Sequence, residues 1–260
     1  MPEGDTVWLS AKRMHDALAG RRLTGSDFRV PRYATSDLSG QTVLAVVPRG
    51  KHMLTRFDSG LTLHTHFEME GTWRTFTAGQ HWSGGPAHEI RIVLSNEVKT
   101  AVGYRIPVIE LLDTSAEDSV VGHLGPDLLD PEFDEAEALR RLRDAPEVTI
   151  GDALLDQRNL AGIGNLYKAE VLFLTGVDPW TAVGEVTNLE KVVSVSRRLL
   201  VANRDRDDQI TTGNRRRGEH TWAYGRFGRP CRRCATPIRR ADQGPPGKER
   251  VTYWCPSCQK

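Results

Sequence analysis

The first residues after the initiator methionine combine a nucleophile with an acid. Removal of Met1 before a residue as small as Pro2 would leave a secondary amine at the chain terminus, beside the carboxylic acid of Glu3. Amines attack carbonyl carbons to form Schiff bases, and a terminal amine with a pKa of about 7.7–8.0 is partly unprotonated near neutral pH. An ordinary exposed terminus could carry the same residues, so their meaning depends on the rest of the chain.

All four cysteines form two Cys-x-x-Cys pairs near the C-terminus. Cys231 pairs with Cys234 and Cys255 with Cys258, and 20 residues separate the pairs. Two such pairs on tight turns can bring four sulfurs to a tetrahedral zinc ion. Two disulfides are the alternative, but no hydrophobic secretory segment is visible near the N-terminus, which favours thiols. We therefore predict one structural Zn²⁺ with no open coordination position for chemistry.

Positive charge is concentrated around these cysteines. Residues 211–260 contain 12 Lys and Arg against 3 Asp and Glu, while the whole chain has a net charge of only +1. Guanidinium groups pair well with phosphate oxygens, so a zinc hairpin that carries many of them is typical of nucleic-acid binding. A solvated basic tail would have the same composition.

The N-terminal segment reads as one helix. Asp5 or Thr6 would cap it, and Gly20 would end it. Pro2 would then lie at the positive end of the helix, where the field lowers the pKa of a terminal amine. The same field favours the carboxylate of Glu3 over its acid form.

The remaining elements change character along the 260 residues. Period-two alternation, as in 61–67 and 90–94, predicts an antiparallel β-sandwich within an N-terminal domain over residues 1–122. A turn-rich hinge follows at 123–130, and helical spacing then predicts a helical domain over 131–222. Residues 223–260 would form the zinc-finger β-hairpin. The predicted fold class is α+β and multidomain, and the 38% apolar content excludes a membrane protein.

A glycine turn joins two of the predicted helices. Gly162 and Gly164 can both take positive φ and let a phosphate approach the backbone, and Asn165 would open the second helix. Taken alone, this pattern also fits a plain helix connection.

Taken together and in this order, the motifs resemble the formamidopyrimidine-DNA glycosylase and endonuclease VIII family of base-excision repair enzymes. The resemblance runs nearly end to end. It implies a catalytic β-sandwich, a helix–two-turn–helix at about 150–180 and a zinc finger. Its motifs are Pro2-Glu3-Gly4, Arg49-Gly50-Lys51, His64 through Gly71, His123-Leu124-Gly125-Pro126, Leu155 through Tyr167, Ala223-Tyr224-Gly225-Arg226, and Arg250 through Gln259.

The resemblance implies roles for three catalytic residues. Pro2 would attack C1′ of the damaged nucleotide's sugar, and Glu3 would protonate the ring oxygen or shuttle protons during the eliminations. Lys51 would hold the phosphate beside the lesion, although a solvated turn lysine would look the same in the sequence.

The resemblance also implies DNA contacts. Asn165 and Arg250 would grip the flanking phosphates, so that the duplex bends and the base can leave the stack. Met69 would fill the vacated space, although a methionine in a strand core is the alternative. His66 and Tyr224 would contact phosphates, but buried structural residues of these types are equally common.

The chain departs from the family pattern at two places. Asp5 and Thr6 follow Gly4 where better-known members have Pro-Glu, which leaves open how protons are supplied. Residues 102–108 replace a loop that reads Asp-Pro-Arg-Arg-Phe-Gly in the 8-oxoguanine branch, and only Arg105 remains as a DNA contact. The altered loop favours the endonuclease VIII-like branch and oxidised pyrimidines.

We predict a bifunctional DNA glycosylase and abasic-site lyase that works through a Schiff base at Pro2 and β,δ-elimination. It would act as a monomer on damaged duplex or single-stranded DNA, without an organic or redox cofactor. We expect a cytoplasmic, nucleoid-associated protein with no signal peptide, transmembrane segment or membrane partner. Two alternatives stay open: a damaged- or abasic-DNA-binding paralogue with weak or lost catalysis, and a zinc-ribbon RNA-binding protein.

Overall fold

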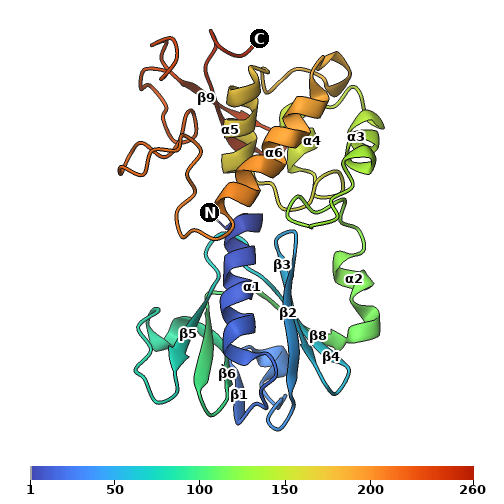
Figure 1. Cartoon of the computed structure of the whole chain (residues 1–260), viewed down its shortest axis with the longest axis vertical. Helices are drawn as coiled ribbons and strands as arrows, with labels where there is room; N and C mark the ends of the chain where they lie inside the picture. The colour runs from blue at the N-terminus through green and yellow to red at the C-terminus, as the bar shows by residue number, and fades with distance from the viewer. Residues whose placement is uncertain (1) are drawn as a thin grey trace. The chain divides into compact units, whose positions relative to one another are not determined.

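The computed structural model describes residues 2–260, which form two compact units (Figure 1). The first ends at His123 and the second runs from Leu124 to Lys260. Met1, whose removal the sequence predicts, lies outside the described residues. Within residues 2–260, no helix is long and apolar enough to cross a membrane.

The first unit contains two four-stranded antiparallel sheets. One has the strand order β1-β6-β7-β5 and the other β2-β3-β4-β8. The predicted β-sandwich is therefore confirmed. The strands are β1 (Gly25–Phe28), β2 (Val43–Arg49), β3 (His52–Phe57), β4 (Leu61–His66), β5 (Thr72–Thr77), β6 (Ile90–Ser95), β7 (Lys99–Tyr104) and β8 (Val108–Asp113).

Helix α1 (Gly4–Leu18) contacts strands of both sheets and completes their core (Figure 1). Its buried face includes Val7, Met14 and Leu18, which belong to one apolar cluster with residues from both sheets. A short helix, α2 (Asp118–Val121), follows β8. Single turns of 3-10 helix lie at Pro31–Tyr33, Ala87–Glu89, Thr114–Ala116 and, in the second unit, Val183–Glu185.

The predicted cap of α1 is wrong. The helix begins at Gly4 with Glu3 as its N-cap, and Asp5 lies in the first turn. Glu3 has extended backbone angles (φ −122°, ψ −174°), and its carbonyl oxygen accepts the N–H of Val7 at 3.1 Å. The helix starts where this first intrahelical bond forms, so the capping preference of Asp5 does not decide the boundary. Gly20, just beyond the end, has φ +72°, as a helix stop requires.

Four helices form the body of the second unit. They are α3 (Glu135–Arg143), α4 (Ile150–Leu155), α5 (Asn165–Thr175) and α6 (Leu189–Asn203). Helix α5 is central: it contacts α4, α6 and strand β10, and all of its residues except Leu174 are buried. The helices α4 and α5 occupy the predicted helix–two-turn–helix region.

An antiparallel hairpin of β9 (Arg239–Gln243) and β10 (Arg250–Trp254) lies beside α5 and carries the cysteine pairs at its ends. Its apolar cluster includes Phe173 of α5, Ile238 and Cys255. The predicted fold class is thus confirmed. The finer boundaries at 122, 130 and 222 stay predictions.

Candidate active site and nucleic-acid interface

Pro2 and Glu3 lie at the N-terminal end of α1. Glu3 is fully buried and Pro2 is half-buried. The carboxylate of Asp5, 2% exposed, accepts the N–H of Thr6 at 2.8 Å in the same first turn. The positive end of a helix favours carboxylates and disfavours a protonated amine. Two buried acids therefore lie within one helical turn of the predicted nucleophile.

Lys51 lies in the turn between β2 and β3, where Arg49 pairs with His52 across a two-residue loop. Gly50 has φ +58° at the first loop position, a conformation that hairpin turns demand and glycine adopts without strain. Lys51 is half-buried, so its side chain is only partly exposed to solvent.

Imidazoles adjoin Lys51 on β3 and β4. His52 pairs directly with His66 across the two strands, and their ring centroids are 4.7 Å apart. Burial, with repulsion from neighbouring imidazoles and Lys51, lowers the pKa of His52 to about 3. Burial followed by the charge of Lys51 lowers the pKa of His66 to about 4. Both rings are therefore neutral beside the lysine at physiological pH.

The segment after His66 presents Met69 to solvent. Met69 is 55% exposed, so the predicted loop position is favoured over the alternative in a strand core. Glu68 has φ +47°, and the N–H of Gly71 returns to the carbonyl of Phe67 at 2.9 Å. A Cβ at Gly71 would come within 2.8 Å of the Phe67 backbone, so this close turn requires glycine.

Arg105 lies beside the Met69 segment. Its Nε donates to the carbonyl oxygen of Glu70 at 3.4 Å, and its Nη1 forms an ion pair with Glu89. The backbone of Arg105 is also left-handed, with φ +50°. The structure thus brings together Arg105 and the loop that carries Met69, which are far apart in the sequence.

In the second unit, Asn165 opens α5 as predicted. Its side-chain amide donates to the carbonyl oxygen of Val251 at 2.8 Å, next to the exposed Arg250. Gly162 has the expected positive φ of +100°. The expectation for Gly164 is wrong: as the N-cap of α5 it is extended (φ −134°, ψ −163°), because the chain enters the helix there.

Tyr224 is positioned by a buried carboxylate on α5. Glu170, 0% exposed, accepts the backbone N–H groups of Trp222, Ala223 and Tyr224 at 2.7–2.8 Å and also the hydroxyl of Thr211. Burial raises the pKa of Glu170, and these donors oppose the shift by stabilising the carboxylate. The ring of Tyr224 packs at 5.3 Å from that of Tyr253 on β10.

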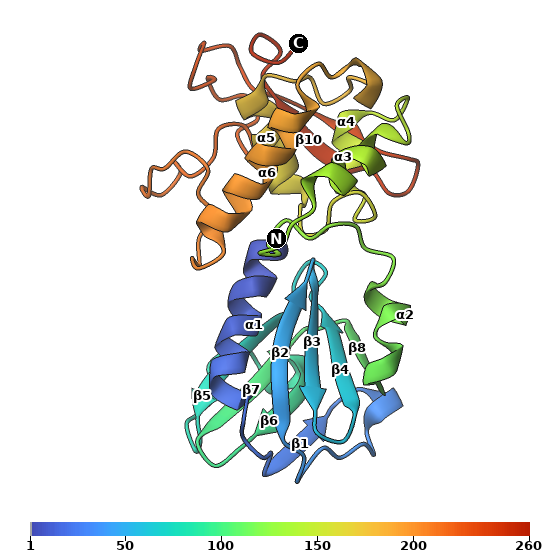
Figure 2. The same ribbon diagram turned by 45° about the vertical axis from the view of Figure 1, so that its right-hand side comes forward.

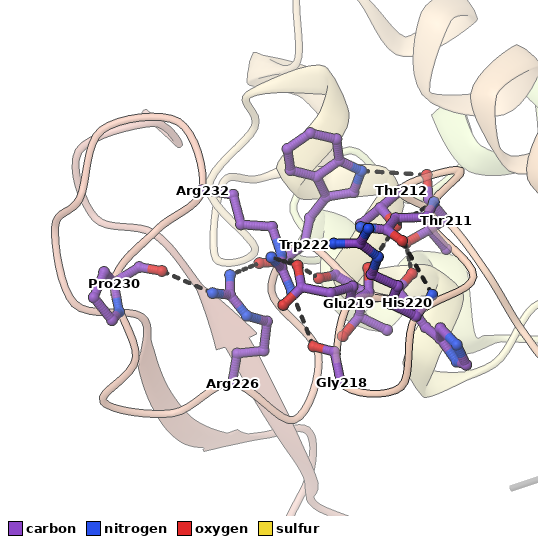
Figure 3. Close-up of polar contacts among 12 residues, drawn as sticks. Thr211, Thr212, Gly218, Glu219, His220, Trp222, Arg226, Pro230 and Arg232 are labelled. Atoms are coloured by element: carbon purple, nitrogen blue, oxygen red, sulfur yellow. Dashed lines mark hydrogen bonds and ion pairs between the residues drawn. The ribbon is translucent and has the colours of Figure 1, made fainter.

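Two arginines hold the loop of residues 211–222 (Figure 3). Arg232 donates to the carbonyl oxygens of Gly218 and Thr221 and forms an ion pair with Glu219. Arg226 donates to the carbonyl oxygens of Trp222 and Pro230 at 2.7 and 2.9 Å. These guanidiniums are used inside the protein, whereas Arg215, Arg216 and Arg217 at the tip of the loop are exposed.

The four cysteines meet in one place. Their sulfur atoms all lie within 4.8 Å of one another, with contacts of 3.4–3.8 Å, and all four are free thiols, so the disulfide alternative is wrong. Sulfurs at about 2.3 Å from a tetrahedral zinc ion would be separated by about 3.8 Å. Gln259 accepts the N–H of Cys255 and donates to Val177, which ties the cluster to the end of α5.

Comparison with known protein families gives matches over most of the chain. The formamidopyrimidine-DNA glycosylase N-terminal domain matches residues 1–105, and the formamidopyrimidine-DNA glycosylase H2TH domain matches residues 124–200. The chain belongs to the formamidopyrimidine-DNA glycosylase family. This membership confirms the predicted family and the predicted class of enzyme, a DNA-repair glycosylase.

Relatives of this family member carry endonuclease 8 names. A probable endonuclease 8 2 of Streptomyces coelicolor is 59% identical, over 100% of this chain and 94% of the relative. The DNA-(apurinic or apyrimidinic site) lyase Nei2 of Mycolicibacterium smegmatis is 45% identical over 100% and 99%. Endonuclease 8 of Escherichia coli is 31% identical over both full chains. These names agree with the predicted endonuclease VIII-like branch.

Solved structures agree with the family at the level of the fold. MutM in complex with DNA containing carbocyclic 8-oxo-G has a TM-score of 0.82 at 22% identity, and both chains are covered fully. The Lactococcus lactis Fpg in complex with abasic-site DNA has a TM-score of 0.81 at 21% identity, again over both full chains.

The sequence prediction for this glycosylase missed several polar residues around the site. His52, His64 and Glu110 meet across three strands, and Glu170 holds the segment that leads to Tyr224. The alternation of His64 and His66 was an available signal for the first group. For Glu170 the signal was its place, with Lys168, among the mostly apolar residues of α5.

Proposed function

We propose that this protein is a bifunctional DNA glycosylase and abasic-site lyase of base-excision repair. The observation that carries the proposal is the placement of Pro2 beside the fully buried Glu3 at the N-terminus of α1, in a chain of the glycosylase family. The relative named as a DNA-(apurinic or apyrimidinic site) lyase, 45% identical over the whole chain, supports the lyase part.

In the proposed mechanism, the Pro2 nitrogen attacks C1′ and the damaged base leaves with the electrons of its glycosidic bond. Opening of the sugar gives an iminium ion, which acts as an electron sink. Loss of the C2′ proton then expels the 3′ phosphate, and a second elimination expels the 5′ phosphate. Glu3 donates a proton to the ring oxygen and exchanges protons in the later steps, a task for which its place beside Pro2 suits it.

The DNA would be held by cations and polar groups from both units. In the first unit Lys51 binds the phosphate beside the lesion, and Met69 enters the space that the extruded base leaves. In the second unit Asn165, which contacts Val251 at the start of β10, and the preceding residue Arg250 bind flanking phosphates. The exposure of Met69 and Arg250 supports these roles.

The metal would be one structural Zn²⁺ bound by Cys231, Cys234, Cys255 and Cys258. The sulfur separations fit a tetrahedral site, and four thiolates leave no position for substrate. Zinc would close the hairpin that carries Arg250 and leave the chemistry to the first unit.

Oxidised pyrimidines are the proposed substrates. Arg105 forms an ion pair with Glu89, which competes with any contact from its guanidinium to an opposite base. Together with the altered loop of residues 102–108, this pair supports the substrate class of the endonuclease VIII-like branch.

Borohydride trapping on an oligonucleotide with an abasic site tests the proposal. Protein with a free Pro2 should form a covalent complex, whereas protein that keeps one extra N-terminal residue should not. Pro2→Gly, which keeps a weaker primary amine, should lose most lyase activity and keep its DNA affinity. Equal activity of this variant and the parent would remove Pro2 from the mechanism, and binding without any trapping would favour the DNA-binding paralogue.

A further inference from the structure

A row of polar side chains crosses the face of the β2-β3-β4-β8 sheet that lies opposite the core. Met53, Leu63 and Ile109 point into the core cluster, so their neighbours in the alternating strands point to the other face. Direct cross-strand pairs on that face are His52 with His66 and His64 with Glu110. Figure 2 shows these strands side by side, with α2 next to them.

Three of these side chains form a hydrogen-bonded relay. Glu110 Oε2 lies 2.9 Å from His64 Nδ1, and His64 Nε2 lies 2.8 Å from His52 Nδ1. A carboxylate only accepts, so Nδ1 of His64 must carry its proton. In a neutral ring Nε2 of His64 is then the acceptor, and His52 must donate from Nδ1. The contacts of His64, which is 3% exposed, thus fix the Nδ1–H tautomer in both His64 and His52.

His52, the last residue of the relay, packs against His66, whose tautomer is fixed by a separate contact. The backbone N–H of Glu68 donates to Nδ1 of His66 at 3.2 Å. The neutral His66 ring therefore carries its proton on Nε2 and can offer this N–H to an external acceptor. The same bond holds Glu68 at its left-handed φ of +47°, immediately before the exposed Met69.

Burial, assisted by neighbouring groups, keeps His52 and His66 neutral. His52 is surrounded by His64, His66 and His123, with ring centroids 4.7–6.0 Å away, and Lys51 repels a proton from His52 and from His66. The carboxylate of Glu110 supplies an opposing charge and contacts His64. Further along the same face, Arg56 and Glu117 neutralise each other.

We propose that Glu110, His64 and His52 are positioning residues: they fix the ring of His52, against which His66 packs as a neutral Nε2–H donor to a DNA phosphate, while Lys51 supplies the positive charge. The inference rests on the proposed DNA-binding role of Lys51 and His66. It assigns different roles to the two residues: Lys51 contributes positive charge, and the neutral His66 contributes a directed hydrogen bond. His66 itself accepts the N–H of Glu68 in the loop that presents Met69.

Long-range proton–nitrogen NMR of the imidazoles tests the relay in the intact protein without DNA. At neutral pH we expect Nδ1–H tautomers for His52 and His64 and the Nε2–H tautomer for His66. His64→Leu should turn His52 into a tautomer mixture, while His66 keeps its Nε2–H tautomer because the N–H of Glu68 still donates to its Nδ1. His64→Gln, which offers one donor and one acceptor, should restore the pattern. An unchanged His52 tautomer in His64→Leu, or a charged His66 in the parent, would overturn the proposal.

Affinity for a duplex with a tetrahydrofuran abasic analogue, measured at several salt concentrations, tests the different roles of Lys51 and His66. Lys51→Ala should reduce the salt slope by about one charge, whereas His66→Ala should weaken binding without changing the slope. His64→Leu should weaken binding about three- to tenfold, with His64→Gln within about twofold of the parent. Thr114→Val, which loses a 3.0 Å bond to Thr62 on the same face, is the matched control.

The outcomes separate the two proposals. A salt slope that falls in His66→Ala would show a charged imidazole and overturn the relay while the DNA-binding function stands. Failure of the parent protein to bind the duplex at all would overturn the proposed function, and the NMR tautomers would still report whether the relay exists.

Discussion

The side-chain amide of Asn165 donates to the carbonyl oxygen of Val251 at 2.8 Å, which joins the first residue of α5 to strand β10. One turn further along the helix, the fully buried Lys168 donates to the Thr252 hydroxyl at 2.6 Å. These two bonds hold the hairpin against the helix N-terminus. Because Arg250 directly precedes Val251, its guanidinium extends from a fixed strand, so little backbone freedom is lost when it binds a phosphate.

We expect Arg250→Ala to weaken binding of abasic-site DNA by about tenfold and to reduce the salt slope by about one charge. The salt slope distinguishes a lost phosphate contact from a folding defect, because a folding defect lowers the fraction of active protein without changing how many counterions are released on binding. The matched control is Arg140→Ala on α3, since Arg140 is occupied by Glu137 and Asp144. An unchanged slope in Arg250→Ala would exclude a phosphate contact by this residue.

Cys255→Ser should release zinc and weaken DNA binding, because a hairpin of this size folds around its metal. Bound zinc is measured by elemental analysis, and affinity on the same samples by fluorescence anisotropy. Ser257→Ala is the control within the hairpin: it removes the 2.9 Å contact with Thr236 and no sulfur ligand. Full DNA affinity in zinc-free Cys255→Ser protein would contradict a structural role for the metal.

Glu170→Gln should lower the free energy of unfolding by about 1–3 kcal/mol, because an amide accepts through only one atom and leaves buried N–H groups unpaired. The loop of residues 211–222 should open first, so cleavage by trypsin at Arg215–217 should accelerate. Glu190→Gln on α6, which changes an exposed carboxylate, is the matched control. Equal cleavage rates in both variants would mean that Glu170 does not hold the loop.

Local constraints explain what the sequence could predict. Each Cys-x-x-Cys pair fixes its own turn, and period-two alternation fixes which face of a strand is buried, so the cluster at Cys231 and the β-sandwich follow from short stretches of chain. Asn165 was placed correctly at the start of α5 for the same reason, since the glycines before it mark a helix boundary.

Strand register and the backbone conformation at the start of a helix explain what the sequence could not predict. The contact between His64 and Glu110 depends on how β4 aligns with β8, which only the folded sheet decides. The start of α1 depends on the extended backbone of Glu3, not on the capping preference of Asp5. Likewise, Arg105 is an ion-pair partner because Glu89 comes to it from the turn before β6.

The histidine row should make the first unit unstable in mild acid. The pKa values of His52 and His66, about 3 and about 4, lie below the ordinary value of 6.5, so the unfolded chain binds these protons first as pH falls. The contribution of these two neutral imidazoles to the free energy of unfolding is therefore present above pH 6.5 and is lost as the pH falls towards 4. Between these values the unfolding free energy should fall with a slope approaching two protons, about 2.7 kcal/mol per pH unit. Urea titrations at a series of pH values measure this slope, which His52→Gln or His66→Gln should each reduce by about one proton. The exposed His81→Gln should leave it unchanged, and an equal slope in all three variants would contradict neutral, buried imidazoles in the folded row.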